Sequence, residues 1–267
     1  MMDFWWAYLA LGAFAGFFAG LLGVGGGAIA VPILTTIFLA QGFPKSEVVH
    51  LALGTSMAAI IFTSISSLRA HHSHGAVLWP VVRQITPGIL AGTFGATFVA
   101  SLLPTQPLTI FFACFIAYVA VQMLLNIKPK PHRELPGAVG MSMVGVGIGG
   151  VSALVAIGGG SLTVPFMTWC NVKPHNAIGT SAAIGLPISI AGTLGYLVNG
   201  WGYPGLPAGT IGFIYVPGLI MVTLVSTLVA PFGAKLAHRL PVATLKRVFA
   251  GVLILLVVKM LWGVFGG

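Results

Sequence analysis

The chain has 267 residues, of which 57% are hydrophobic and 6% are charged, and its mean hydropathy is +1.04. A water-soluble protein carries roughly 25% charged residues, so this composition excludes a soluble enzyme or a soluble nucleic-acid-binding domain, in spite of the net charge of +9. We therefore predict an all-α integral membrane protein that lies in a lipid bilayer and binds no nucleic acid.

Apolar segments bounded by charged residues, Pro or Gly follow one another along the whole chain. Because a helix rises about 1.5 Å per residue, roughly 20 apolar residues cross a hydrocarbon core of about 30 Å. Two of the segments are too short to cross comfortably, and each follows a glycine triplet. The predicted segments are 4–23, 28–41, 47–68, 80–103, 106–127, 137–157, 161–171, 175–198, 209–231 and 242–265.

The two glycine triplets belong to an internal repeat. Gly25-Gly26-Gly27, followed by Val31-Pro32, recurs 133 residues later as Gly158-Gly159-Gly160, followed by Val164-Pro165. Each copy is predicted to open its half of the chain with a glycine-broken helix hairpin, either re-entrant or fully spanning.

A second duplicated element extends the repeat over nearly the whole chain. Gly54-Thr55-Ser56 recurs as Gly179-Thr180-Ser181, and His50, Phe112 and Met123 recur as His175, Phe249 and Met260. We predict a first transmembrane repeat over 1–127, a basic cytoplasmic linker over 128–136 and a second transmembrane repeat over 137–267.

Basic residues predict the orientation, because Lys and Arg gather on the cytoplasmic side of membrane proteins. Both termini then lie in the periplasm of a multi-pass inner-membrane protein. Five segments in each half also make the halves run in opposite directions, the inverted-topology repeat of many secondary transporters. The basic side collects Arg69, Lys128, Lys130, Arg133, Lys173, Lys235, Arg239, Lys246 and Arg247, whereas the other side has Lys45 and Lys259.

The glycine breaks are candidate binding sites, because unpaired backbone groups at membrane depth must face protein or a watery cavity. A helix that restarts after a triplet points free N–H groups and the positive end of its dipole outward, which suits an anion. The alternative is that these glycines only let helices pack closely. The candidate anion-binding glycines are Gly25, Gly26, Gly27, Gly158, Gly159 and Gly160.

Four hydroxyls complete the predicted anion site: Thr55 and Ser56 in one half, Thr180 and Ser181 in the other. Each hydroxyl can donate to an anion's oxygens, although Ser and Thr in membrane helices often bond to the carbonyl one turn back instead.

Three ionisable residues are further candidates. Arg83 could attract or gate an anion, or could extend to the membrane surface. His175 and its equivalent His50 could donate hydrogen bonds or titrate, or could simply mark the interfacial starts of helices.

Metal binding and catalysis have weaker support. His71, His72 and His74 are expected in a loop with no carboxylate or thiolate beside them, so no metal site is predicted. No Walker lysine motif, H-E-x-x-H or G-x-S-x-G sequence occurs. We predict no enzymatic activity and no cofactor.

The paired triplets with Val-Pro, the paired Gly-Thr-Ser elements and the basic central loop resemble the sulfite exporter TauE/SafE family of membrane permeases, from about Phe14 to Trp262. This resemblance implies transport of small sulfur-containing anions, such as sulfite, sulfoacetate, other organosulfonates or thiosulfate, across a bacterial inner membrane.

Export is the predicted direction, because an interior-negative potential favours anion exit by about 2.3 kcal/mol per charge per 100 mV. Asp3, Glu47 and Glu134 lie at segment ends or in a loop, so no buried carboxylate is expected to carry a proton for uptake. The alternatives are a permease for sulfonate or thiosulfate uptake, a metal cation transporter using the loop histidines, and a non-transporting subunit of a sulfur-processing complex. A homo-oligomer is compatible with each of them.

Overall fold

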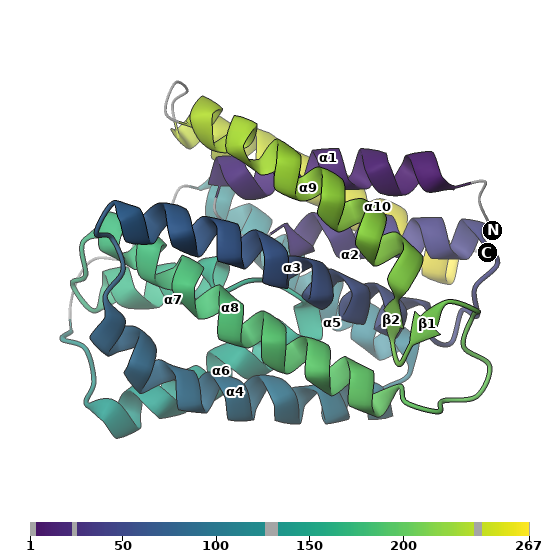
Figure 1. Cartoon of the computed structure of the whole chain (residues 1–267), viewed down its shortest axis with the longest axis horizontal. Helices are drawn as coiled ribbons and strands as arrows, with labels where there is room; N and C mark the ends of the chain where they lie inside the picture. The colour runs from purple at the N-terminus through teal and green to yellow at the C-terminus, as the bar shows by residue number, and fades with distance from the viewer. Residues whose placement is uncertain (1–3, 23–25, 126–132, 238–241, 267) are drawn as a thin grey trace.

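The computed structural model describes residues 4–22, 26–125, 133–237 and 242–266, and in these ranges it contains ten helices and one short β-hairpin (Figure 1). The first half forms α1 (Trp5–Leu22), α2 (Gly27–Ala40), α3 (Val48–Ser73), α4 (Trp79–Leu102) and α5 (Thr105–Leu124). The second half forms α6 (Ala138–Val155), α7 (Gly160–Trp169), α8 (Pro174–Asn199), β1 (Thr210–Ile211), β2 (Ile214–Tyr215), α9 (Val216–Ala237) and α10 (Val242–Phe265).

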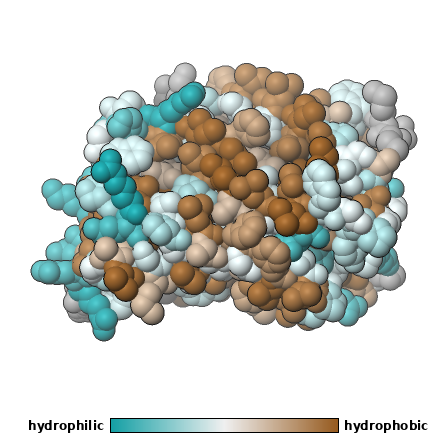
Figure 2. Space-filling model, turned by 60° about the horizontal axis from the view of Figure 1, so that its bottom comes forward, coloured by the Kyte–Doolittle hydropathy of each residue, from teal (hydrophilic) through white to brown (hydrophobic). Residues whose placement is uncertain are grey.

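Seven of these helices, α3, α4, α5, α6, α8, α9 and α10, are long and apolar enough to cross a membrane. Large apolar side chains such as Leu102, Val139 and Trp262 are more than three-quarters exposed, which suits contact with lipid rather than water. Figure 2 shows apolar side chains over the middle of one face and polar side chains gathered at its left-hand end. The predicted all-α membrane fold is confirmed.

Two segment boundaries differ from the prediction. The expected helix over 209–231 begins only at Val216, because Gly209 and Gly212 adopt positive φ and the chain forms the antiparallel β1–β2 hairpin first. Helix α3 continues past residue 68 to Ser73 and stops before Gly75, which has φ +66°. His71 and His72 therefore lie in the last helical turn and not in a loop.

The two sequence halves interlock. Helix α1 packs along α9 and α4 packs along α6, so each pair joins helices from different halves, while α3 packs against α8 and α5 against α10. The paired helices approach so closely that a Cβ added to an interfacial glycine would lie within 2.7 Å of a backbone oxygen on the partner helix. Equivalent glycines make these contacts: Gly12 and Gly16 meet Val222 and Ser226, and Gly145 and Gly149 meet Ile85 and Ile89.

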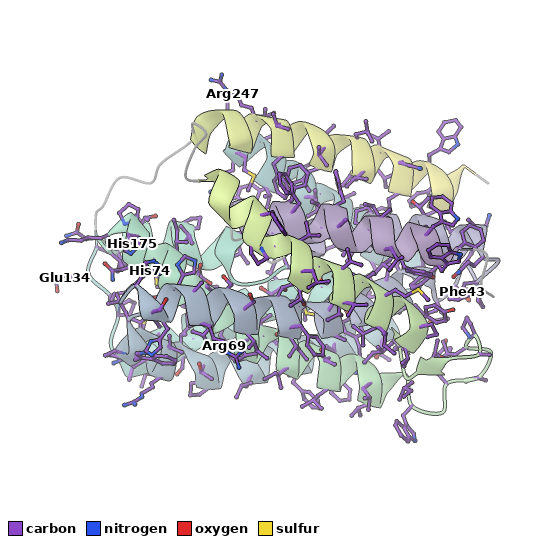
Figure 3. The ribbon with its side chains drawn as sticks, turned by 45° about the horizontal axis from the view of Figure 1, so that its top comes forward. Phe43, Arg69, His74, Glu134, His175 and Arg247 are labelled. Carbon is purple, nitrogen blue, oxygen red and sulfur yellow. The ribbon has the colours of Figure 1, made fainter. Side chains whose placement is uncertain are left out.

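The ends of the helix bundle differ in chemistry. The start of α1 and the end of α10 lie together at one end, beside the β1–β2 hairpin (Figure 1). His74, Glu134, His175 and Arg247 lie at the other end, which we call the basic end, and Phe43 lies at the first (Figure 3). Several predicted residues and segments lie outside the described residues, namely Asp3, Gly25, most of the linker over 128–136, with Lys128 and Lys130, and Arg239.

Candidate functional site

The helices α1 and α2 form one hairpin, and α6 and α7 form another, and the two open at opposite ends of the bundle. At the open end of the first hairpin, the Tyr8 hydroxyl donates a hydrogen bond to Gln41 Oε1 over 2.7 Å. At the open end of the second, the Arg133 guanidinium lies 5.0 Å from the centre of the Trp169 ring, close to Glu134 at the basic end (Figure 3). The turns of the two hairpins therefore point toward each other inside the molecule.

The two hairpin tips touch. A Cβ added to Gly27, the first residue of α2, would lie 1.7 Å from the carbonyl oxygen of Ala156, in the turn between α6 and α7. Gly26 before it has φ +72°, and Ala156 itself has φ +45°, a conformation that costs an alanine about 1–2 kcal/mol. A side chain at position 27 would collide with this carbonyl, so Gly27 permits the close contact between the two hairpins.

Both short helices begin without a side-chain cap. Gly26 is the N-cap of α2 and Gly159 is the N-cap of α7, and neither helix start has a capping side-chain hydrogen bond. Ser, Thr, Asp or Asn would normally occupy the N-cap and satisfy one free N–H group. Gly158 lies buried in the turn before α7, and Gly160 is its first residue. The first N–H groups of α2 and α7 therefore have no acceptor on an N-cap side chain.

Three buried hydroxyls near the tips lack a hydrogen-bond partner among the described residues: Ser56 on α3, and Ser161 and Thr163 on α7. Their side chains are at most 8% exposed. Leaving a buried hydroxyl unsatisfied costs about 1–3 kcal/mol, so such groups call for a ligand or water. Sequence reasoning missed Ser161 and Thr163, although they follow the second triplet directly, on alternate residues.

The other predicted hydroxyls make bonds within the protein. The Thr55 hydroxyl accepts a hydrogen bond from the Tyr215 N–H, and the Thr180 hydroxyl accepts one from the Leu78 N–H, each over 2.9 Å. Tyr215 and Leu78 are the residues before α9 and near the start of α4, so the two threonines fix equivalent connections. Ser181 donates to the Ile178 carbonyl one turn back. Ser56 alone of the four is left unpaired.

The ionisable candidates lie away from the tips. Arg83 is exposed on the second turn of α4, and His175 is exposed on the first turn of α8, at the basic end (Figure 3). His50, the sequence equivalent of His175, is instead 2% exposed, and its Nε2 lies 2.9 Å from the Ala100 carbonyl oxygen. Its Nδ1 lies 3.6 Å from Glu47 Oε2. The structure brings neither Arg83 nor His175 to the glycine tips.

Two of the three neighbouring histidines, His72 and His74, make local contacts. His72 Nδ1 accepts a hydrogen bond from the Trp79 indole N–H, and His74 Nδ1 lies 2.7 Å from the Ala70 carbonyl oxygen. Over the described ranges, no three His, Cys, Asp or Glu side chains are placed to share a metal ion. The geometry gives the metal-transport alternative no support.

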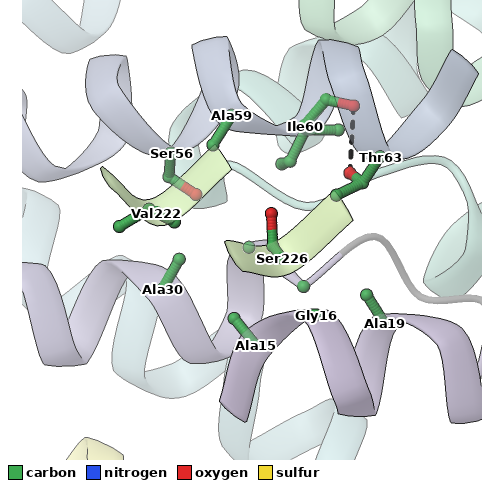
Figure 4. Close-up of a pocket in the computed structure, with 12 residues that line it drawn as sticks. Ala15, Gly16, Ala19, Ala30, Ser56, Ala59, Ile60, Thr63, Val222 and Ser226 are labelled. Atoms are coloured by element: carbon green, nitrogen blue, oxygen red, sulfur yellow. Dashed lines mark hydrogen bonds between the residues drawn. The ribbon is translucent and has the colours of Figure 1, made fainter. Parts of the chain in front are cut away.

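A small cavity lies beside the first hairpin tip, between α1, α2, α3 and α9 (Figure 4). Gly26, Gly27, Ser56, Thr63 and Ser226 contribute to its wall, and the Thr63 hydroxyl donates to the Ile60 carbonyl. Its volume of about 20 Å³ suits roughly one water molecule. This cavity is too small for an organic anion unless the surrounding helices separate.

Comparison with known proteins agrees with this architecture. The model of the family "Sulfite exporter TauE/SafE" matches residues 8–260. A probable membrane transporter protein of Haemophilus influenzae is 37% identical over 257 residues, covering 94% of this chain and 96% of the relative. One of Xylella fastidiosa is 30% identical over 260 residues, covering 94% and 92%, and YunE of Bacillus subtilis, also a probable membrane transporter protein, is 26% identical over 213 residues, covering 72% and 78%.

No solved structure matches the chain significantly. The family match covers α2 to α9 completely and most of α1 and α10. The curated relatives named above are probable membrane transporters by their printed names. The chain belongs to the sulfite exporter TauE/SafE family of membrane transporters.

Proposed function

We propose that this protein is a secondary transporter that exports small sulfur-containing anions, such as sulfite or sulfoacetate, across the bacterial inner membrane by alternating access. The family supports a small anion as substrate. The observation that carries the choice of site is the meeting of Gly27 with Ala156, beside three unpaired buried hydroxyls. In this proposal the anion lies between the N-termini of α2 and α7, where it accepts hydrogen bonds from Ser56, Ser161 and Thr163.

The proposed site needs no buried Lys or Arg. Two helix N-termini each present about half a positive charge, and hydrogen bonds from hydroxyls to an anion each contribute about 1.5–3 kcal/mol. Weak, distributed attraction of this kind suits a transporter, because the anion must also leave. Gly26, Gly27, Gly158, Gly159 and Gly160 supply the backbone of the site, whereas Thr55 and Thr180 hold the surrounding helices in place.

In support of alternating access, hydrogen bonds join α4 to α8 at one end of the bundle. At the end away from the basic residues, Asn199 on α8 donates to the Thr97 hydroxyl on α4 over 3.1 Å and accepts from Ser101 over 3.4 Å. We propose that α4 and α8 form a closed gate at this end.

The orientation proposal places the basic end in the cytoplasm and both termini in the periplasm, with the halves 1–127 and 137–267 as inverted repeats. It is supported by the opposite directions of the two hairpins and by the position of Arg69, Lys173 and Arg247. Alkaline phosphatase fused to the C-terminus is expected to be active, and green fluorescent protein fused there is expected to be dark. The reverse result contradicts the orientation.

The function is tested by measuring the export of sulfite and sulfoacetate from proteoliposomes with a defined membrane potential. Ser56→Ala is expected to weaken apparent affinity about tenfold or more, since one hydrogen bond to a charged ligand is lost. Ser181→Ala is the matched control at the equivalent position, because its hydroxyl already bonds within α8. Wild-type vesicles that move neither anion would contradict the proposal and favour a non-transporting subunit. Transport that requires an imposed cation gradient would favour the uptake alternative.

A further inference from the structure

A second, larger cavity lies on the outside of the bundle between α3 and α9. It is a groove of about 330 Å³ lined by Phe62, Ile65, Ser66 and Arg69 of α3 and by Thr227 of α9. The groove lies between a helix of the first half and a helix of the second, and its Arg69 is on the side of the basic end (Figure 3). Neither the proposed transport site nor the family assignment uses any of these five residues.

The groove opens sideways and is separate from the central cavity. At about 100° per residue, Ser56, Ile60 and Thr63 share one face of α3, whereas the groove residues of α3 centre on a face turned by roughly a third of a turn. The side chain of Phe62 is 48% exposed, and those of Leu224 and Leu228 on α9 are 63% and 65% exposed. Apolar side chains exposed in this way on a membrane-spanning helix face lipid chains.

Polarity changes along the groove as it does along a phospholipid. Arg69 lies four residues before the end of α3, or about 6 Å from it, whereas Phe62 lies about 10 Å deeper. Helix α3 has 26 residues and is about 39 Å long, so its last turns reach beyond a hydrocarbon core of about 30 Å. The long side chain of Arg69 can therefore extend to headgroup depth, with Phe62 and Ile65 at the depth of the acyl chain.

Arg69 has no carboxylate partner in the part of the chain that the structure describes. No Asp or Glu among the described residues lies within ion-pair distance of its guanidinium, although it is exposed at the mouth of the groove. A guanidinium forms bidentate hydrogen bonds with phosphate, and Ser66 and Thr227 place two hydroxyls in the same groove. A basic pocket between transmembrane helices at the cytoplasmic surface is a suitable site for an anionic lipid headgroup.

We infer that this groove binds an anionic phospholipid, with the lipid phosphate on Arg69 and one acyl chain along Phe62 and Ile65. The bound lipid bridges α3 and α9 and so stabilises the contact between the two halves at the basic end. The inference concerns a lipid and not the transported anion, so its test is independent of any transport measurement.

The test uses the purified full chain in detergent, with native mass spectrometry and thermal unfolding as the two readouts. Phosphatidylglycerol is expected to bind and raise the unfolding temperature, whereas phosphatidylcholine is not. Arg69→Gln is expected to weaken phosphatidylglycerol binding about fivefold, and Arg69→Lys, which keeps the charge but loses the bidentate geometry, is expected to weaken it less. Arg83→Gln is the matched control, because Arg83 is also exposed near the basic end but lies outside the groove.

Two results would overturn the inference. In the first, Arg69→Gln binds phosphatidylglycerol as tightly as the wild type and Arg83→Gln do. In the second, glycerol phosphate or sulfoacetate, which lack acyl chains, displaces phosphatidylglycerol at equal concentration, which would make the groove a small-anion vestibule. Phe62→Ala tests the contribution of the acyl chain alone. It is expected to weaken phosphatidylglycerol binding while leaving the headgroup contact with Arg69 in place.

Discussion

The two hairpins share the sequence Gly-Gly-Gly-x-x-x-Val-Pro, yet the residues inside that shared frame differ in chemistry. After the first triplet come Ala28 and Ala30, which are buried and apolar, beside the small cavity. After the second come Ser161 and Thr163, whose buried hydroxyls lack partners in the described structure. The first tip supplies close backbone approach and space, and the second supplies hydrogen-bond donors.

This difference shows how two repeats with the same backbone motif can offer different contacts to an asymmetric ligand. The repeated residues, such as Thr55 and Thr180, make equivalent structural bonds in both halves. The residues that differ lie at the proposed anion site, where the two hairpin tips would offer different contacts to the substrate. The following predictions separate the contributions of the two tips and of the repeated frame.

The largest effect is expected at the first tip. Gly27→Leu would force a side chain into the Ala156 carbonyl, and overpacking at this contact costs about 1–3 kcal/mol, so most of the transport activity is expected to be lost. Gly147→Leu is the matched control, because a Cβ there meets nothing within 4 Å. Flux in proteoliposomes and the elution profile on gel filtration are measured together. Normal flux in Gly27→Leu would show that the tips need not touch.

A tenfold effect is expected at the second tip. Thr163→Val should weaken apparent affinity for the anion about tenfold, and it should leave thermal stability equal or higher because an unsatisfied buried hydroxyl is removed. Thr168→Val on the same helix serves for comparison, since that hydroxyl already donates to the Val164 carbonyl over 2.9 Å. Equal affinities in the two variants would show that the Thr163 hydroxyl of α7 does not bind the anion.

The smallest effect on transport is expected in the repeated frame. Thr55→Val and Thr180→Val each leave a backbone N–H without its acceptor, so each should lower the free energy of unfolding by about 1–3 kcal/mol. Affinity of the folded protein should change less than threefold. Chemical unfolding in detergent, followed by tryptophan fluorescence, measures the first quantity. A large loss of affinity without loss of stability would restore both threonines to the binding site.

Much of the fold followed from the sequence because bilayer thickness and hydrophobic length constrain helices strongly. The helical segments, the paired triplets and the membrane class were predictable, and the structure and family confirm the membrane fold. The β1–β2 hairpin was not predictable, because Phe213 to Tyr215 are as apolar as a membrane helix. The chain turns into a hairpin there because Gly209 and Gly212 adopt positive φ.

The candidate site was less predictable, because hydropathy reports burial and not hydrogen bonding. Whether a hydroxyl is free depends on distant backbone groups, as when Tyr215 donates to Thr55 across 160 residues of sequence. The unpaired state of Ser161 and Thr163 likewise appears only once the surrounding helices are placed. Arg69 was interpreted as an orientation signal, and nothing local to it indicated the groove shared with α9.

The pairing of α1 with α9 has a consequence for how this protein is made. Gly16 packs against Ser226, which is synthesised about 200 residues later. At about 5–20 residues per second, the ribosome needs about 10–40 s to make the intervening chain. During that time the glycine surface of α1 has no final partner, so the first half has no complete structure to fold into. Expression of residues 1–127 alone should therefore yield a fragment that is degraded, and co-expression with residues 137–267 should rescue it.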